Sequence, residues 1–200
     1  MGKRLFDLAI SLIVFIIFFL PIICISLLVL LKLGKPIFYS QLRPGKNGKI
    51  FRMYKFRTMT NECDINGQLI AKEKRMSLFG NKLRRTSIDE LPELLNVIKG
   101  EMSLVGPRPL RVEYLPYYSP EQSRRHEVKP GITGWAQING RNSISWEDRF
   151  KLDVWYVDNK SFRLDIKIIF LTVGKVLKRE GINKNAETTM EPFKGVKLND

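Results

Sequence analysis

The chain has 200 residues, which suits one domain with one modest hydrophobic core rather than two full domains. Its 34 Lys and Arg residues outnumber 20 Asp and Glu residues, giving a formal net charge of +14. This excess indicates a polyanionic partner, and composition leaves open nucleic acid, anionic lipid and phosphorylated substrates. Two cysteines without a C-x-x-C pair, and the single histidine His126, argue against a zinc site or a disulfide framework.

The N-terminal segment is apolar, with no charged side chain from Leu8 to Leu31. A helix of that length can cross a hydrocarbon core of ~30 Å. A signal peptide has a shorter apolar core and a small-residue cleavage site, so we expect residues 1–35 to remain as a membrane anchor. Pro21 lies near the middle of the run. It removes one backbone hydrogen bond and therefore predicts a kink.

The orientation of this anchor stays open at the level of residue patterns. Lys3 and Arg4 flank one end, and Lys32 and Lys35 flank the other. The positive-inside rule therefore gives no direction. A kinked helix with two basic ends could enter the bilayer and return to the same face. An ordinary spanning helix with a proline kink fits the pattern equally well.

After the anchor the sequence becomes polar and globular, and we expect one cytosolic catalytic domain over residues 36–185. Residues 37–40 and 49–54 have the pattern of short strands on either side of the turn-rich segment 43–48, which predicts a β-hairpin. Residues 60–75 are polar and predict a loop with a short helix. The domain therefore begins with a small antiparallel unit.

Helical patterns dominate the rest of the chain. Residues 87–98 and 145–156 are expected to be helices, with a Pro- and Gly-dense irregular region between them. Residues 165–180 form an amphipathic pattern whose basic side suits a membrane surface, although a core-packed helix with a solvated face fits as well. Residues 186–200 are expected to form a loosely ordered tail. The inward side of the 165–180 helix is predicted to carry Ile166, Ile169, Phe170, Val173 and Leu177.

The adjacent carboxylates Asp89 and Glu90 are the strongest candidates for chemistry. Ser87 and Glu90 have the spacing of a capping box, and Asp89 would suit the first turn of a helix, so a structural role is one explanation. Pro92 would then sit inside the helix at the cost of a hydrogen bond, and such strain is typical of functional sites. A carboxylate can also attack a phosphoryl group, and Mg²⁺ prefers one or two carboxylates together with phosphate oxygens.

Several cations could neutralise phosphate oxygens in bidentate fashion. Arg108 lies between two prolines, which hold its backbone extended and limit the entropy lost on anion binding. Arg84 precedes the carboxylates, Arg141 follows a glycine in a turn-like segment, and Lys55 and Arg57 lie in a basic, aromatic strand region. Each of these, apart from Arg108, also fits the pattern of a surface cation.

The chain lacks a G-x-G-x-x-G motif, a P-loop and a D-x-D pair. Its motifs instead resemble, in order from the anchor to about residue 190, those of the bacterial sugar transferases, which are monotopic polyprenyl-phosphate phosphoglycosyl transferases. The motifs that carry the resemblance are Arg43-Pro44-Gly45, Tyr54-Lys55-Phe56-Arg57-Thr58-Met59, Ser87-Ile88-Asp89-Glu90-Leu91-Pro92, Gly106-Pro107-Arg108-Pro109, Lys129-Pro130-Gly131-Ile132-Thr133-Gly134-Trp135-Ala136-Gln137 and Asn139-Gly140-Arg141.

The resemblance implies a two-step reaction. Asp89 matches the nucleophile that attacks the β-phosphate of a UDP-sugar, so that UMP leaves and a phosphosugar remains on the carboxylate. Undecaprenyl phosphate then attacks this intermediate. Glu90 matches the partner that contacts the metal or activates the acceptor. Mg²⁺ is the implied cofactor, held by Asp89 and Glu90. Arg108 matches a phosphate-binding loop, and Arg141 matches a position implicated in binding the nucleotide-sugar.

Short length and local details resemble the minimal members of the family. That likeness implies UDP-N,N′-diacetylbacillosamine as the donor, in protein N-glycosylation. Transfer from another UDP-sugar, carrying glucose, galactose or an N-acetylhexosamine, for capsule, O-antigen or exopolysaccharide, is the alternative. A non-catalytic, membrane-bound polyanion-binding protein is the rival from another class, and the ordered set of motifs argues against it. A non-catalytic relative that serves as a scaffold is a third possibility, and the intact Asp89-Glu90 pair argues against that one.

The family anchor is a broken, re-entrant helix with both ends on the cytoplasmic face of the bacterial inner membrane. Its break is often Ser-Pro, whereas this chain has Leu20-Pro21, so the kink would rest on Pro21 alone. The implied partners are a UDP-sugar, undecaprenyl phosphate, membrane lipids and downstream glycosyltransferases, but no nucleic acid. The expected fold is α+β and mainly helical: a re-entrant helix, then one small cytosolic domain with a short β-hairpin and interfacial amphipathic helices.

Overall fold

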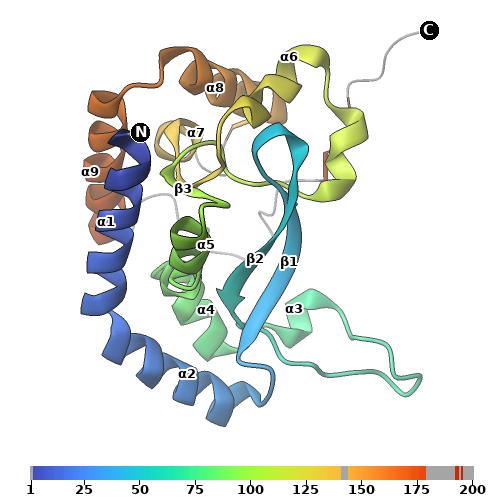
Figure 1. Ribbon diagram of the computed structural model, residues 1–200. Helices are drawn as coiled ribbons and strands as arrows, with labels where there is room; N and C mark the ends of the chain where they lie inside the picture. Colours follow the sequence, from blue (N-terminus) through green and yellow to red (C-terminus); the bar gives the residue numbers. More distant parts are fainter. Residues whose placement is uncertain (1, 141–143, 179–191, 194, 196–200) are drawn as a thin grey trace, which may run out of the picture.

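The protein is mainly helical, as expected, and its N-terminal segment is a bent helix pair (Figure 1). The computed structural model describes residues 2–140, 144–178, 192, 193 and 195. Helix α1 (Gly2–Ile17) is followed by helix α2 (Phe19–Leu33), and the pair is bent by 62° from a straight line. The bend lies one turn before Pro21, because a proline ring clashes with the carbonyl four residues earlier, here that of Ile17. The predicted kink is therefore present, and the clash explains its place.

Neither helix alone, nor any other single helix in the described ranges, has both the length and the apolar composition needed to span a bilayer. Taken together, α1 and α2 reach that length and composition. The structure thus contains one bent apolar element where the sequence predicted a kinked anchor.

Polar side chains attach α1 to the rest of the protein. Arg4 donates hydrogen bonds to the carbonyls of Val97 (2.5 Å) and Ile98 (2.7 Å). The buried carboxylate of Asp7 accepts a hydrogen bond from Ser103 Oγ at 2.8 Å. Phe6, Ile10 and Val14 of α1 pack against the main core, whereas other apolar side chains of this helix face outward. The exposed apolar residues of α1 are Leu5, Leu12, Ile13, Ile16 and Ile17.

The predicted β-hairpin is confirmed and is longer than expected. Strand β1 (Phe38–Pro44) pairs antiparallel with β2 (Ile50–Phe56), from Phe38 opposite Phe56 to Pro44 opposite Ile50. The 3₁₀ turn η1 (Lys46–Gly48) joins them. In Figure 1 the two strands of the hairpin run side by side through the middle of the view. Its register brings Lys55 of β2 toward the segment that carries the acidic pair, since β2 packs against that segment.

Short elements connect the hairpin to the end of the domain. They are α3 (Lys72–Arg75), α4 (Leu78–Arg85), η2 (Ile88–Glu90), α5 (Glu93–Lys99), β3 (Ser103–Val105), η3 (Val112–Tyr117), α6 (Pro120–Ser123), η4 (Arg124–Glu127), β4 (Gly131–Thr133), α7 (Trp135–Asn139), α8 (Trp146–Asn159) and α9 (Phe162–Lys178). Strand β3 pairs in parallel with β4. The helices predicted near 145–156 and 165–180 are therefore present as α8 and α9.

The main core lies between the hairpin, α5, β3, α8 and α9. Figure 1 shows α1 and α9 side by side along one edge of this core. Its fully buried members include Val97, Met102, Tyr156 and Ile168. The hydroxyl of Tyr156 donates a 2.6 Å hydrogen bond to Asp165, which joins α8 to α9. Polar contacts at the edges of the core therefore set the orientation of α9.

The predicted inward face of α9 is partly wrong. Phe170 is 73% exposed and Val173 is also exposed, whereas Ile168 is completely buried. Asp165 explains the rotation, because it is buried between Lys3 of α1 and Tyr156 of α8 and so turns Ile168, three residues on, into the core. Ile166 and Ile169 are half-buried. The side chain of Leu177 lies outside the described part of the chain.

Candidate active site

The segment that carries the acidic pair is not the continuous helix predicted over residues 87–98. Ser87 has a left-handed φ of 56°, and its side chain makes no cap hydrogen bond, so the predicted capping box is absent. Asp89 and Glu90 lie in the short 3₁₀ turn η2. Helix α5 begins only at Glu93, just after Pro92. Proline is tolerated before the first helical turn but not inside a helix, which explains the break.

Glu90 is held by two cations. Its Oε1 accepts a hydrogen bond from Lys55 Nζ at 2.6 Å and another from the guanidinium of Arg108. Burial alone would raise the pKa of Glu90, but the attraction of Arg108 and Lys55 outweighs it and holds that pKa well below its usual range. Glu90 is therefore a fixed anion that orients the two cations.

Asp89 has a different environment although it is the neighbouring residue. Its side chain is buried, with the residue 7% exposed, and no donor in the described part of the chain hydrogen bonds to its carboxylate. Burial and the adjacent charge of Glu90 raise the pKa of Asp89 to about 6, against the opposing attraction of Lys55 and two arginines. At neutral pH Asp89 is therefore mostly ionised, more basic than an ordinary aspartate, and unengaged by donors.

A third carboxylate, Glu93, joins the site, and the sequence analysis missed it. It is 1% exposed, and its Oε1 lies 3.1 Å from Lys55 Nζ. Burial raises the pKa of Glu93 to about 7, although Lys55 lowers it. Its spacing of three residues from Glu90 could have identified it, because residues three apart share one side of a helical turn.

The other predicted phosphate-binding residues are placed differently from one another. Arg84 Nε donates to Thr58 Oγ1 at 2.9 Å, and its charge acts on Asp89. The structure does not bring Arg57 to the carboxylates. Its guanidinium donates to the Lys35 carbonyl at 2.9 Å and to the two carbonyls before it, which ties the end of α2 to the hairpin. Arg141 lies outside the described residues.

The site therefore joins residues from three separate segments. Lys55 comes from β2, the carboxylates come from η2 and the start of α5, and Arg108 comes from the loop after β3. A buried carboxylate lies beside cations that can neutralise phosphate oxygens. This arrangement suits nucleophilic attack on a phosphoryl group.

The chain matches known proteins over most of its length. The family described as bacterial sugar transferase matches residues 1–179. EpsL of Bacillus subtilis (strain 168), described as an uncharacterized sugar transferase, is 58% identical over 193 residues and 96% of each chain. The undecaprenyl-phosphate galactose phosphotransferase of Salmonella typhimurium is 37% identical over 90% of this chain and 41% of that protein.

A relative whose name states glucose also matches most of this chain but only part of its own length. The UDP-glucose:undecaprenyl-phosphate glucose-1-phosphate transferase of Escherichia coli (strain K12) is 40% identical over 86% of this chain. The match spans 39% of that relative, so the chain corresponds to about two fifths of the longer proteins. Because the family match runs from the bent helix pair through the carboxylate site to the end of α9, this chain belongs to the bacterial sugar transferase family.

Proposed function

We propose that this chain transfers a sugar 1-phosphate from a UDP-sugar to undecaprenyl phosphate and releases UMP. The observation that carries the proposal is the buried carboxylate of Asp89, which receives no hydrogen bond from the described residues, beside the cation-bound carboxylate of Glu90. Two neighbouring acids whose pKa values are pushed apart take different chemical roles. The names of the relatives support the same reaction class.

The proposed first step makes Asp89 the nucleophile. A carboxylate oxygen attacks the β-phosphorus of the UDP-sugar, and the bond from that phosphorus to the bridging oxygen breaks. UMP leaves with the electron pair, and the sugar phosphate stays on Asp89 as an acyl-phosphate. Arg108 and Lys55, both oriented by Glu90, neutralise charge on the phosphate oxygens.

In the proposed second step, a phosphate oxygen of undecaprenyl phosphate attacks the same phosphorus. The acyl-phosphate bond breaks, Asp89 returns as a carboxylate, and undecaprenyl diphosphate-sugar leaves. Atoms and charges balance without an oxidant or reductant. The raised pKa of Asp89 suits the first step, because a more basic carboxylate is a better nucleophile and a pKa of about 6 still leaves it ionised at pH 7.

Mg²⁺ is the proposed cofactor. The described residues contain no cluster of three metal-binding side chains, but Mg²⁺ typically takes one or two carboxylates and completes its shell with phosphate oxygens and water. The hard oxygens of Asp89 and Glu90 fit that pattern. The ion would supply positive charge to the transferring phosphoryl group.

For the transferred sugar, we propose glucose or galactose in preference to N,N′-diacetylbacillosamine. The relatives whose names state a sugar include galactose and glucose enzymes, and another is named an exopolysaccharide production protein. These names favour polysaccharide assembly over protein glycosylation. The substrate expected from the minimal family members is therefore the second choice.

We also propose that α1 and α2 form a re-entrant anchor at the cytoplasmic face of the inner membrane. Two observations support this proposal: the pair is bent, as a re-entrant element requires, and both of its ends are basic. The outward apolar side chains of the pair, together with exposed Phe170 and Val173 of α9, suit contact with lipid. Site and anchor would then meet a lipid-linked acceptor at the membrane surface.

The test measures UMP release by the purified full chain with Mg²⁺ and undecaprenyl phosphate. UDP-galactose, UDP-glucose, UDP-N-acetylglucosamine and UDP-N,N′-diacetylbacillosamine are compared. We expect UMP release with a hexose donor. Asp89→Asn should lower the rate of UMP release by at least about 100-fold, whereas Asp64→Asn, the control at an exposed position, should keep near-full activity. Trapping without acceptor should place the phosphosugar on Asp89 by mass spectrometry.

Two outcomes would overturn the proposal. One is a phosphosugar trapped on a different residue, and the other is near-full activity of Asp89→Asn. Salt-sensitive DNA binding without UMP release from any donor would instead support the polyanion-binding alternative.

A further inference from the structure

Behind the proposed phosphate-binding loop lies a buried ion pair. Arg125 of η4 is 2% exposed, and its Nη2 and Nε donate to one carboxylate oxygen of Asp153 at 2.7 and 3.1 Å. The same Nη2 donates to the main-chain carbonyl of Arg108 at 2.8 Å. One guanidinium thus connects α8 to the residue that contacts Glu90.

Aromatic rings enclose this pair. The centre of the Arg125 guanidinium lies 5.6 Å from the ring of Phe150 and 5.8 Å from that of Tyr118. Phe193, 8% exposed, packs edge-on against Phe150 at 5.0 Å and stacks on Tyr118 at 5.7 Å. Phe193 lies beyond residues 1–179, the range that the family match covers. Water is excluded around the pair, so its hydrogen bonds are directional and costly to break.

The contact with Arg108 lies in a loop with few main-chain donors, where the Pro107 carbonyl accepts one hydrogen bond from the Gly131 N–H at 3.0 Å. Pro107 and Pro109 have no backbone N–H, so they cannot anchor the loop by donating hydrogen bonds. The carbonyl of Arg108 between them is the acceptor that Arg125 uses. A shift of that carbonyl would move the Arg108 side chain relative to Glu90.

We propose that Arg125, neutralised by Asp153 and flanked by the rings of Phe150 and Tyr118, is a positioning residue that orients Arg108 for phosphate binding. This inference rests on the proposed function. Arg125 itself does not contact substrate in this proposal. It acts through the main chain of Arg108, and Asp153 keeps its guanidinium in place.

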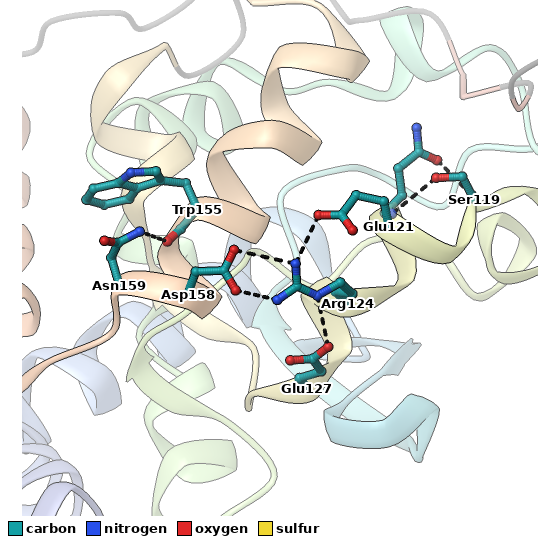
Figure 2. A network of polar contacts seen from close by, with 8 residues as sticks. Ser119, Glu121, Arg124, Glu127, Trp155, Asp158 and Asn159 are labelled. Carbon is teal, nitrogen blue, oxygen red and sulfur yellow. Dashed lines mark hydrogen bonds and ion pairs between the residues drawn. The ribbon is translucent and has the colours of Figure 1, made fainter.

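The neighbouring residue offers a matched control. Arg124, in the same 3₁₀ turn, pairs at the surface with Glu121 at 3.0 Å, Glu127 at 3.2 Å and Asp158 (Figure 2). Figure 2 shows these three acids gathered around its guanidinium. Exposed pairs of this kind contribute little, so replacing Arg124 tests the loss of an arginine without the buried contact.

The experiment compares Arg125→Lys with Arg124→Lys, each in the wild-type and Arg108→Ala backgrounds. Lysine keeps the charge beside Asp153 but lacks the fork that reaches both acceptors. We expect Arg125→Lys to lower kcat/KM for UMP release by about 10- to 100-fold, as a displaced catalytic contact does. Arg124→Lys should stay within about twofold. In the Arg108→Ala background, Arg125→Lys should add almost nothing.

An equal loss in both backgrounds would show that Arg125 acts only on the general fold, and no loss in either would also overturn the proposal. A second readout, which does not need turnover, is the NMR signal of the Arg108 guanidinium. This signal is assigned because it is absent from the spectrum of Arg108→Lys. It should shift or broaden in Arg125→Lys and stay unchanged in Arg124→Lys. An unchanged signal in both variants overturns the inference, whereas a wild-type protein that releases no UMP overturns only the proposed function.

Discussion

Asp89 and Glu90 follow one another in the chain, yet their carboxyl groups have opposite electrostatic surroundings. Glu90 is bound by Lys55 and Arg108, and its pKa is lowered. Asp89 receives no hydrogen bond from the described residues, and burial raises its pKa to about 6. The 3₁₀ turn explains the difference, because it directs two consecutive side chains to different neighbours. One carboxylate is thereby bound by cations, and the other is left without a donor among the described residues.

The first prediction concerns the pH dependence of UMP release. A nucleophile must be ionised, so the rate should be level above pH 7 and fall about tenfold per unit below pH 6, where Asp89 takes up a proton. The measurement is the initial rate between pH 5 and 8. Glu93→Gln is the control, because the pKa of Glu93 is raised to about 7. If this variant loses the acidic limb, Glu93 rather than Asp89 is the titrating group.

The second prediction is that Asp89→Asn stabilises the protein while it removes activity. The folded-state pKa of Asp89 lies above its ordinary value, so its contribution to stability is present at low pH and is lost as pH rises through about 6. Asparagine carries no charge to desolvate. At pH 8 the free energy of unfolding should rise by about 3 kcal/mol, and at pH 4 it should hardly change. Chemical denaturation in detergent at both pH values measures the change in the free energy of unfolding. An equal change at pH 8 and pH 4 would contradict the prediction.

The third prediction concerns Lys55, which links Glu90 and Glu93. Lys55→Met should lower the free energy of unfolding by about 3 kcal/mol at pH 8, because it leaves two buried carboxylates short of a partner. The double variant Lys55→Met/Glu93→Gln should recover part of the loss. Lys49→Met, at an exposed position beside the same strand, is the control and should have little effect. Equal losses in the single and double variants would show that Glu93 is not coupled to Lys55.

The fourth prediction concerns the bend before Pro21. With Cys24→Ser and Cys63→Ser, a cysteine at Gly2 reports the start of α1, a position where an added Cβ meets no atom within 4 Å. In a separate Cys24→Ser variant, native exposed Cys63 reports the domain. In intact spheroplasts an impermeant maleimide should label neither.

Pro21→Ala restores the missing hydrogen-bond donor and removes the clash with Ile17. The straightened helix should then place the Gly2→Cys thiol outside, where the maleimide labels it. Labelling of this thiol while Pro21 is intact would contradict the re-entrant arrangement.

The fifth prediction concerns the C-terminal aromatic contact. Phe193→Ala should cost about 3 kcal/mol of folding free energy, because it removes a buried ring from a tightly packed cluster. Phe170→Ala is the matched control, since that ring is 73% exposed and should matter within about 0.5 kcal/mol in detergent. Thermal and chemical unfolding of both variants measure the difference. Similar small effects would show that Phe193 is not part of the folded core.

Part of this protein could be predicted from its sequence because the causes are local. A proline clashes with the carbonyl four residues earlier, so the bend near Pro21 follows from chain geometry. Alternating strand residues around a turn-rich segment predict the hairpin of β1 and β2. The ordered motifs identify the family and single out Asp89, Glu90 and Arg108. Pro92 indicated strain, but the apolar pattern still predicted one helix over residues 87–98, and the structure shows a break there instead.

The tertiary structure decided which groups meet. Lys55 and Glu90 are 35 residues apart, Arg125 and Asp153 are 28 apart, and neither pairing has a local signature. The fold also brought Glu93 into the site and turned Arg57 away to the end of α2. Residue types and motifs specify which chemistry is present, but pKa values depend on burial and on charges from distant segments. Only the packed chain could therefore distinguish the unengaged Asp89 from the cation-bound Glu90.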